Sequence, residues 1–196
     1  VAEGVLRDSA FPVYLSNPLA QRDPVHRVNP SCRRILVPLD GASRSDRILP
    51  LVIDLSRVDG AEVTLLHIEH PLALVMLSPG AAYIPPPQIP QEHHFLDSAR
   101  KHLEHAGVTV RTAVSTGDPV GGIVEASLRK GADLVAMTTH GRTGFDRWIH
   151  GSVAETVLHQ VPCPMVIQRT NTPVWAAKRV PRRSMADRLK WSALGP

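Results

Sequence analysis

The chain has 196 residues, of which 43% are hydrophobic, so it can form one domain with a sizeable core plus extensions, or at most two small domains. Its apolar runs are far shorter than the roughly 20 residues of a membrane-spanning helix, which argues against a membrane span. The formal net charge of +4 is concentrated in residues 173–196, so we expect no nucleic-acid contact except through this basic tail.

Cysteine content and the N-terminal sequence indicate the compartment. Two cysteines, Cys32 and Cys163, are too few for a disulfide scaffold. The first 16 residues lack the basic start and apolar run of a signal peptide. We therefore expect a reducing, cytoplasmic environment.

The first elements in chain order are a strand in "RRILVPLD" and a helix over residues 44–58, with Pro50 in a late first turn or at a kink. Three glycines then follow helical patterns and precede short apolar runs, so each is expected in a left-handed position after a helix: Gly60, Gly107 and Gly131. The apolar runs read as strands buried on both faces, as in a parallel sheet.

The later elements continue the alternation. Helices are expected over 91–106, over 119–130 with Asp118 as N-cap, and over 152–160 with Ser152 and Glu155 as a capping box. "PMVIQR" is the fifth strand. We therefore predict a single doubly wound five-stranded parallel α/β sheet with helices on both faces. The Pro-rich residues 71–90 are expected to form a long, lid-like loop.

The segment "TTHGRTGFDRWIHGS" follows the fourth strand and precedes the last helix. About a dozen residues connect them, where such a connection usually has 2–6. Glycines before a helix N-terminus let a phosphate approach the backbone N–H groups, and the helix dipole favours the anion. The loop is therefore interpreted as a phosphate cradle, and an ordinary surface loop with a normally capped helix is the alternative. Asp40, at the end of the first strand, is interpreted as a ribose ligand or simply a turn-former before Gly41.

The chain resembles a universal stress protein of the ATP-binding type. That family carries Gly-x-x-Gly-x9-Gly-Ser/Thr, and here Gly141 and Gly151-Ser152 match it while Thr138 replaces the first glycine. "RRILVPLDGASRS", "VTLLHI", "STGDP", "ADLVAMTTHGRTG" and "GSVAETVLHQVPCPMVI" also match family patterns. The resemblance covers about residues 32–170, flanked by an N-terminal extension (1–31, an arm or disordered) and a basic tail (171–196).

The resemblance implies the strand order 3-2-1-4-5 and a nucleotide site. Asp40 would hold the ribose, and the Ile68 backbone would meet adenine with Pro38 and Leu39 nearby. The phosphates of ATP, with Mg²⁺, would lie among residues of the loop and the last helix: Thr138, Gly141, Arg142, Gly144, Gly151, Ser152 and Val153. With the strand order of the family, Cys32 and Cys163 are too far apart for a bridge, roughly 10 Å against a limit of about 7 Å.

A homodimer through the last strand is expected. Pro162 and Pro164 precede this strand, and proline suits an edge or a strand entrance because it lacks an N–H donor. An exposed edge of Met165, Val166 and Ile167 would invite pairing, and the resemblance also implies a dimer here.

No catalytic set or metal site is expected. The histidines of residues 91–106 show no converging ligand geometry, and no Gly-x-Ser-x-Gly elbow occurs. The leading functional hypothesis is an ATP-binding regulatory module of the stress response, at most a slow ATPase. The alternatives are a slow ATP-hydrolysing enzyme and a nucleotide-free partner-binding dimerisation module, and the regulatory protein partner is unknown.

Overall fold

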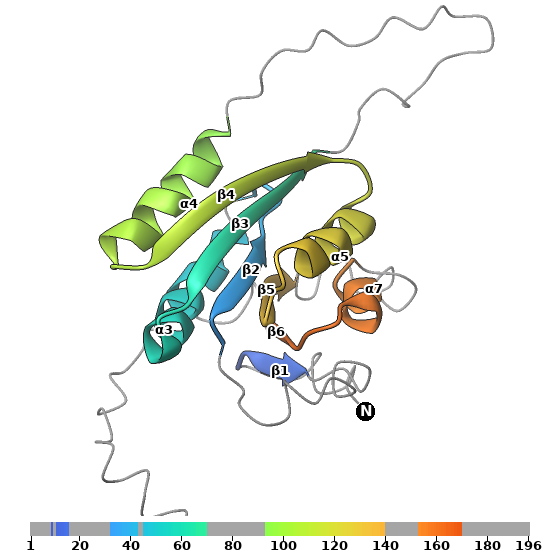
Figure 1. Ribbon diagram of the computed structural model, residues 1–196, viewed down its shortest axis with the longest axis horizontal. Helices are drawn as coiled ribbons and strands as arrows, with labels where there is room; N and C mark the ends of the chain where they lie inside the picture. The colour runs from blue at the N-terminus through green and yellow to red at the C-terminus, as the bar shows by residue number, and fades with distance from the viewer. Residues whose placement is uncertain are drawn as a thin grey trace, which may run out of the picture.

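The six strands form one sheet in the order β1-β6-β5-β2-β3-β4 (Figure 1). The computed structural model describes residues 9, 11–15, 32–42, 45–69, 93–139 and 153–169. The strands are β1 (Val13–Leu15), β2 (Arg34–Pro38), β3 (Glu62–Glu69), β4 (Thr109–Thr116), β5 (Leu134–Thr139) and β6 (Met165–Arg169). All neighbours pair in parallel except β1, which is antiparallel to β6. The five parallel strands thus confirm the predicted order 3-2-1-4-5.

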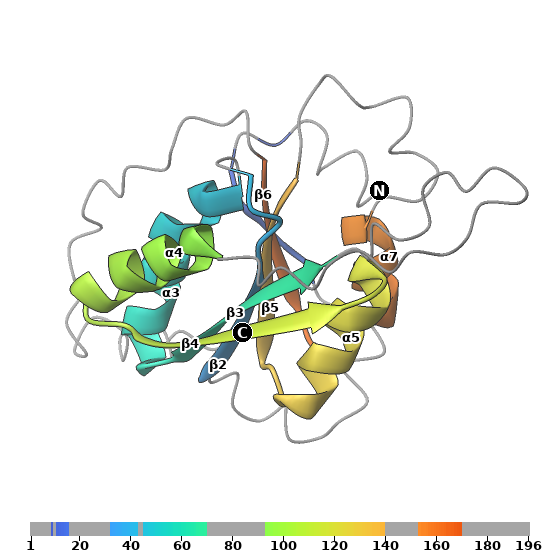
Figure 2. The same ribbon diagram turned by 90° about the horizontal axis from the view of Figure 1, so that it is seen from above.

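Helices cover both faces of the sheet. The 3₁₀ turn η2 (Ser45–Ile48) leads into α3 (Leu49–Asp59), which lies with α4 (His94–His105) on one face. The other face is covered by α5 (Pro119–Arg129) and α7 (Val153–Gln160), as Figure 2 shows. Among the described residues, no helix is long and apolar enough to cross a membrane.

Local sequence explains where these helices begin and end. Gly60 has φ 67° and its N–H donates to the Ser56 carbonyl, which closes α3 in the left-handed position that was expected. Asp118 caps α5 by accepting a hydrogen bond from the Gly121 N–H, and Pro119 occupies the first helical turn. Pro50 likewise lies in the first turn of α3, preceded by η2 rather than causing a kink.

Alternate residues of each central strand enter two separate apolar cores. Ile35 and Val37 of β2 join the core under α3 and α4, whereas Leu36 joins the core under α5 and α7. Because both faces of the strand are buried, its sequence is continuously apolar and lacks a polar face.

The N-terminal extension contributes a strand that the sequence did not reveal. Tyr14 of β1 lies opposite Val166 of β6, and Val13 and Leu15 lie opposite Ile167 and Met165. The prediction that Met165, Val166 and Ile167 form an exposed edge is therefore wrong, since β1 covers it. Three alternating residues are too few to show a periodicity of their own.

The two cysteines are free thiols. Cys32 precedes β2 and Cys163 precedes β6, with β5 between these strands in the sheet. This arrangement agrees with the separation that was expected from the strand order.

Candidate functional site

The carboxyl end of β2 lies where the chain connections diverge. From β2 the chain passes through α3 and α4 on one face of the sheet to β3 and β4. It then crosses through α5 on the other face to β5, the neighbour of β2 on its opposite side. Ligands of open α/β sheets bind at such a switch point, outside the carboxyl ends of the strands.

β2 and β5 stop pairing well before β5 ends. The register between them comprises Ile35 with Leu134 and Leu36 with Val135, whereas β5 continues to Thr139. The backbone groups of successive residues in a strand point alternately to its two neighbouring strands. The Val135 N–H donates to the Pro164 carbonyl, on the β6 side. Thr138 is an odd number of residues further along, so its backbone groups point to the other side, toward β2. The N–H and C=O of Thr138 therefore face the region beyond the end of the β2–β5 pairing.

The backbone of Ile68 faces the same region from the other side. The Leu66 carbonyl accepts from the Leu39 N–H on the β2 side, and the Glu69 carbonyl accepts from the Gly117 N–H on the β4 side. By alternation, the N–H and C=O of Ile68 point toward β2, which has ended at the level of Leu66. Within the described residues neither group has a hydrogen bond to the chain that follows β2.

Asp40 lies between these two sets of backbone groups in the strand order. Its side chain is exposed, and its Oδ1 accepts a hydrogen bond from the Ala42 N–H at 2.9 Å. This turn orients the carboxylate while one oxygen remains without a partner in the described chain. A carboxylate so placed can accept hydrogen bonds from hydroxyl groups.

Leu39 positions its neighbours through its side chain and both of its backbone polar groups. Its side chain is buried in the core under α3 and α4. Its N–H donates to Leu66, and its carbonyl accepts from Nδ1 of His67 at 2.9 Å. Both backbone polar groups of Leu39 are therefore occupied, and Pro38 before it is half-buried.

An aromatic cluster that the sequence analysis did not connect to the site supports the turn after β2. The rings of His67 and Phe95 meet edge to face with centroids 4.9 Å apart. Phe95 also packs over Gly41, where a Cβ would lie 3.3 Å from the ring. Gly41 has φ 82°, so glycine is favoured there by both conformation and space. The spacing of Phe95 in its helix predicted a core residue, but nothing in the sequence indicated its contact with Gly41.

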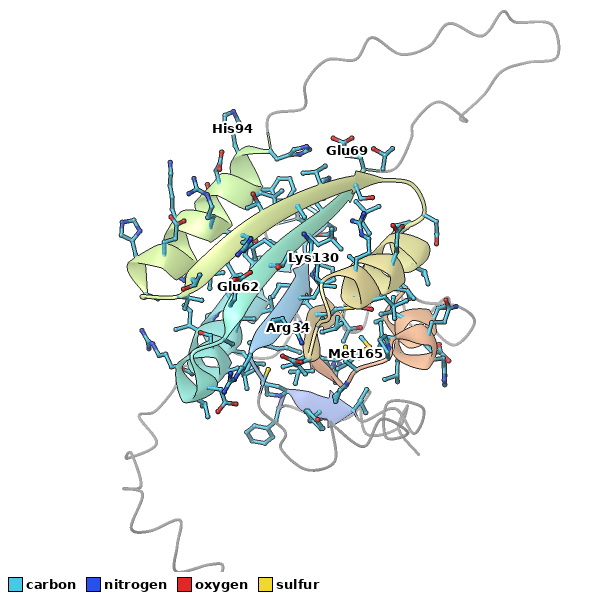
Figure 3. The ribbon with its side chains drawn as sticks, viewed as in Figure 1. Arg34, Glu62, Glu69, His94, Lys130 and Met165 are labelled. Atoms are coloured by element: carbon cyan, nitrogen blue, oxygen red, sulfur yellow. The ribbon has the colours of Figure 1, made fainter. Side chains whose placement is uncertain are left out.

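The side chains of Glu69 and His93 meet at the two borders of the segment that connects β3 to α4, and they form an ion pair when His93 is protonated. His93 Nε2 lies 3.0 Å from Glu69 Oε1, and the Thr116 hydroxyl donates to Glu69 Oε2 at 3.4 Å. Figure 3 shows Glu69 at the end of the sheet opposite Glu62 and Arg34. The expected lid, residues 71–90, lies between Glu69 and His93 in the sequence and outside the described residues.

A second carboxylate lies near Asp40. Burial raises the pKa of Asp46, and the negative charge of Asp40 raises it further, whereas His102 lowers it. Asp46 is thus within electrostatic reach of the candidate site. Sequence reasoning missed it because it lies in a short 3₁₀ turn without a distinctive motif.

Several expected site residues lie outside the described part of the chain: Gly141, Arg142, Gly144, Gly151 and Ser152. Val153 is the first residue of α7, with 39% of its surface exposed. The structure therefore brings Asp40, Ile68 and Thr138 to one end of the sheet. Among the described residues, no group of three or more His, Cys, Asp or Glu side chains could hold a metal ion.

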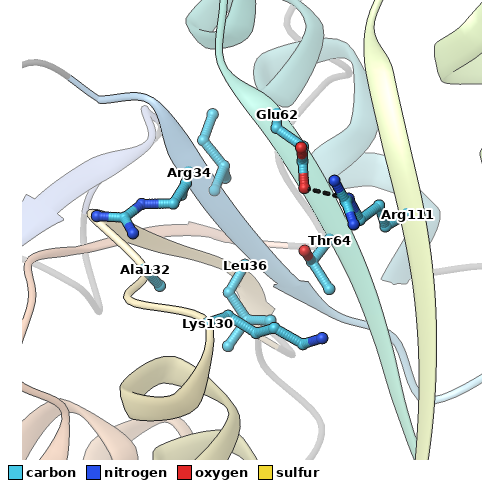
Figure 4. Close-up of a pocket in the computed structure, with 8 residues that line it drawn as sticks. Arg34, Leu36, Glu62, Thr64, Arg111, Lys130 and Ala132 are labelled. Atoms are coloured by element: carbon cyan, nitrogen blue, oxygen red, sulfur yellow. Dashed lines mark ion pairs between the residues drawn. The ribbon is translucent and has the colours of Figure 1, made fainter.

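A hollow of about 80 Å³ opens at the other end of the sheet, at the amino ends of β2, β3 and β4 (Figure 4). Its charged residues are largely balanced, since Arg111 pairs with Glu62 at 2.6 Å and Arg34 with Asp133 at 3.3 Å. The hollow is separate from the groups around Asp40 and lacks the features of a ligand site at a switch point.

Comparison with known proteins agrees with this geometry. The sequence profile described as "Universal stress protein family" matches residues 31–169. Universal stress protein MJ0531 of Methanocaldococcus jannaschii is 30% identical over 137 residues, covering 69% of this chain and 81% of that protein. Universal stress protein YxiE of Bacillus subtilis is 28% identical over 152 residues, covering 69% and 98%.

Solved structures share the fold. A universal stress protein from Archaeoglobus fulgidus superimposes with a TM-score of 0.64 and 22% identity, covering 86% of this chain and 53% of that one. A universal stress protein in complex with cAMP gives a TM-score of 0.57 at 20% identity, covering 71% and 98%. A universal stress protein family protein from Arabidopsis thaliana with AMP bound gives a TM-score of 0.51 at 18% identity. The match covers 77% of this chain and 97% of that one.

Proposed function

Because the chain belongs to the universal stress protein family, we propose that it is an ATP-binding regulatory module of the stress response. The nucleotide would lie across the carboxyl ends of β3, β2 and β5. The observation that carries the proposal is that the backbone groups of Ile68 and Thr138 face the end of β2 from both sides. Both pairs of groups are available to a ligand, because the pairing with β2 has ended.

Ile68 and Asp40 would recognise the nucleoside. An N–H donor beside a C=O acceptor on Ile68 is complementary to N1 and the exocyclic amino group of adenine, which are an acceptor and a donor. Asp40, with one oxygen already fixed by Ala42, would accept hydrogen bonds from the ribose hydroxyls. Pro38 and Leu39 would flank the base at the end of β2.

The phosphates would bind between Thr138 and the start of α7. Glycines of the connecting loop, Gly141, Gly144 and Gly151, would allow close approach to the backbone, and Arg142 would add positive charge. The first N–H groups of α7, at Ser152 and Val153, would face the anion, as the helix dipole favours.

Any Mg²⁺ would depend mainly on the phosphates for its ligands. Magnesium in nucleotide sites is commonly held by phosphate oxygens, waters and one or two carboxylates. Asp40 is assigned to the ribose, so Asp46 beside it would supply such a carboxylate, and no group of three or more acidic or histidine side chains occurs among the described residues. The described residues therefore fit a metal that arrives with the nucleotide.

Nucleotides bound by relatives support an adenine-containing ligand. One structurally similar universal stress protein is described with cAMP and another with AMP. Both ligands share the adenine and ribose that Ile68 and Asp40 would contact. The choice of ATP for this chain rests on the length and glycine content of residues 138–152.

We expect the protein to hold ATP rather than to hydrolyse it rapidly. Fast phosphoryl transfer needs a positioned nucleophile and concentrated positive charge at the phosphates. The carboxylate–histidine pair found here, Glu69 with His93, is at the end of β3, with β2 between it and the proposed phosphate side. Bound nucleotide would act as a conformational signal in the cytoplasm, with residues 71–90 as a lid.

The proposal includes a homodimer through β6, the strand of Met165, Val166 and Ile167. The apolar residues of β6 support it, because this edge would tend to pair once β1 is released. Since β1 occupies this edge, a second copy could pair there only after β1 is displaced.

Mass spectrometry of the purified and then denatured protein tests the nucleotide proposal. We expect ATP to be released in near-stoichiometric amount. A single-turnover assay with labelled ATP and magnesium should then give a rate well below the roughly 1–10³ s⁻¹ of ordinary enzymes. A protein free of nucleotide that also fails to bind added ATP would favour the nucleotide-free partner-binding alternative.

A further inference from the structure

β1 pairs with one edge of β6. It pairs with Met165, Val166 and Ile167, and the last two residues of β6, Gln168 and Arg169, extend beyond this register. On its other side β6 pairs with β5 along its whole length. The edge occupied by β1 is therefore the only edge of β6 at which another strand can add.

β1 itself is held by few interactions. It has three residues, fewer than most strands of globular proteins. Tyr14 is 60% exposed, and Leu15 is the residue of β1 that packs against the core under α5 and α7. Pairing of three residues with one apolar anchor is weak enough for another strand to compete.

We propose that β1 is a displaceable strand that blocks the edge of β6. When β1 is released, a second copy of this chain pairs its own β6 with this edge. Antiparallel pairing, which β1 already adopts, is also the arrangement of two identical strands around a twofold axis. Centred on Ile167, this pairing places Met165 opposite Arg169 and Val166 opposite Gln168, so no like charges face each other directly.

Release of β1 is compatible with an intact domain. Residues 16–31 separate it from the region of β2, and an extended chain of this length reaches about 50 Å. β1 can therefore leave β6 without pulling β2 out of the sheet. A longer pairing would replace it, because β6 of a second copy can align five residues with β6, whereas β1 aligns three.

The inference rests on the homodimer included in the proposed function and not on nucleotide binding. β1 lies beside β6, two strands away from β2 and Asp40. Association and ATP binding can therefore be measured separately, and failure of one does not imply failure of the other.

Sedimentation equilibrium of the full chain carrying Leu15→Asp is the test. The new carboxylate would face the core under α5 and α7 and expel β1. We expect dimerisation to strengthen at least tenfold over the wild type. Phe11→Asp, which adds the same charge to the extension outside β1, should leave association unchanged. Leu15→Ala, a milder change for the fold, should strengthen association in the same direction.

Tyr14 and Val166 lie opposite each other, so a disulfide between Tyr14→Cys and Val166→Cys would hold β1 on β6. This disulfide should reverse the effect of Leu15→Asp. Added to Leu15→Asp, it should abolish dimerisation when oxidised and restore it when reduced. Unchanged association in both Leu15 variants would overturn the proposal. Weakened association would also overturn it, since it would show that β1 is exchanged between copies and supports the dimer.

Discussion

Among single residues, Asp40 combines a fixed orientation with an oxygen available to a ligand. The hydrogen bond from the Ala42 N–H holds the carboxylate before any nucleotide arrives. Packing of Phe95 over Gly41 restrains the turn that follows. Such preorganisation reduces the entropy that a ligand must overcome, so a small number of contacts can give useful affinity.

We predict that Asp40→Asn weakens ATP binding by roughly 10- to 100-fold, because a charge-assisted hydrogen bond to the ribose is lost. The amide oxygen can still accept from Ala42, so the turn should persist. Isothermal titration calorimetry gives the affinity. Asp59→Asn is the matched control, because Asp59 also accepts a backbone N–H, that of Cys32, but at the amino end of β2. Equal affinities for the two variants would exclude Asp40 as a ligand.

The thiols are a second residue-scale feature with measurable consequences. Burial is the main cause, and the charge of Asp133 a second one, that together raise the pKa of Cys32 to about 11 and that of Cys163 to about 12. At pH 8 the folded protein should therefore hold roughly a hundredfold less Cys32 thiolate than the unfolded chain.

Alkylation with iodoacetamide at pH 8 should accordingly be about two orders of magnitude slower for Cys32 in the native protein than in guanidinium. Between about pH 9 and 11 the folded state retains protons that the unfolded state loses, so these thiols make stability fall as pH rises. Urea midpoints across this range check the sign. Rapid native labelling of Cys32 at pH 8 would be incompatible with its raised pKa.

At the scale of elements, α5 approaches β3 closely because it carries glycines. A Cβ on Gly122 would lie 2.6 Å from Cδ1 of Ile68, whereas one on Gly121 would lie 3.4 Å from the Asp118 carboxylate. Gly122 therefore sets the position of Ile68, whose backbone faces the candidate site. The two adjacent glycines differ in this contact, but each lowers the stability of the helix by a similar amount relative to alanine.

We predict that Gly121→Ala stabilises the protein by up to about 1 kcal/mol through helix propensity. Gly122→Ala should be less stable than Gly121→Ala by about 1 kcal/mol, because Ile68 must leave its rotamer. Urea unfolding of both variants measures the difference. Identical free energies of unfolding would show that Ile68 yields freely and that Gly122 does not fix its position.

Elements with a clear periodicity could be predicted from the sequence. Gly60 and Asp118 mark helix ends by their own conformational preferences, so α3 and α5 are encoded locally. β1 could not be predicted, because three residues show no pattern and its existence depends on β6 as a partner. The contact between Glu69 and His93 could not be predicted either, since nothing in the sequence specifies how two segments 24 positions apart meet.

For the candidate site, the residues at strand ends could be predicted and their geometry could not. Asp40 was predicted from its place at the end of the first strand, and Ile68 from the resemblance to the family. That Ile68 and Thr138 both face the end of β2 depends on where pairing stops in the assembled sheet. Register is a tertiary property and is set by packing on both faces.

At the scale of the whole molecule, the two proposed binding regions lie apart along the width of the sheet. The nucleotide would bind at the carboxyl ends of β3, β2 and β5, and the partner copy would bind beyond β6 at the far edge. Thr138 of β5 lies opposite Gln168 of β6, so adjacent strands connect the two places. Gln168 is buried, and its Oε1 has no hydrogen-bond partner in the described chain.

Calorimetric titration of ATP into the full chain, beside the variant Gly151→Leu, tests the central claim most directly. A bulky side chain before α7 would block approach of the phosphates to the helix N-terminus. We predict measurable ATP binding for the wild type, and loss of that binding in Gly151→Leu with an unchanged thermal unfolding midpoint. The same affinity in both proteins, or no binding heat from a nucleotide-free wild type, would contradict the account.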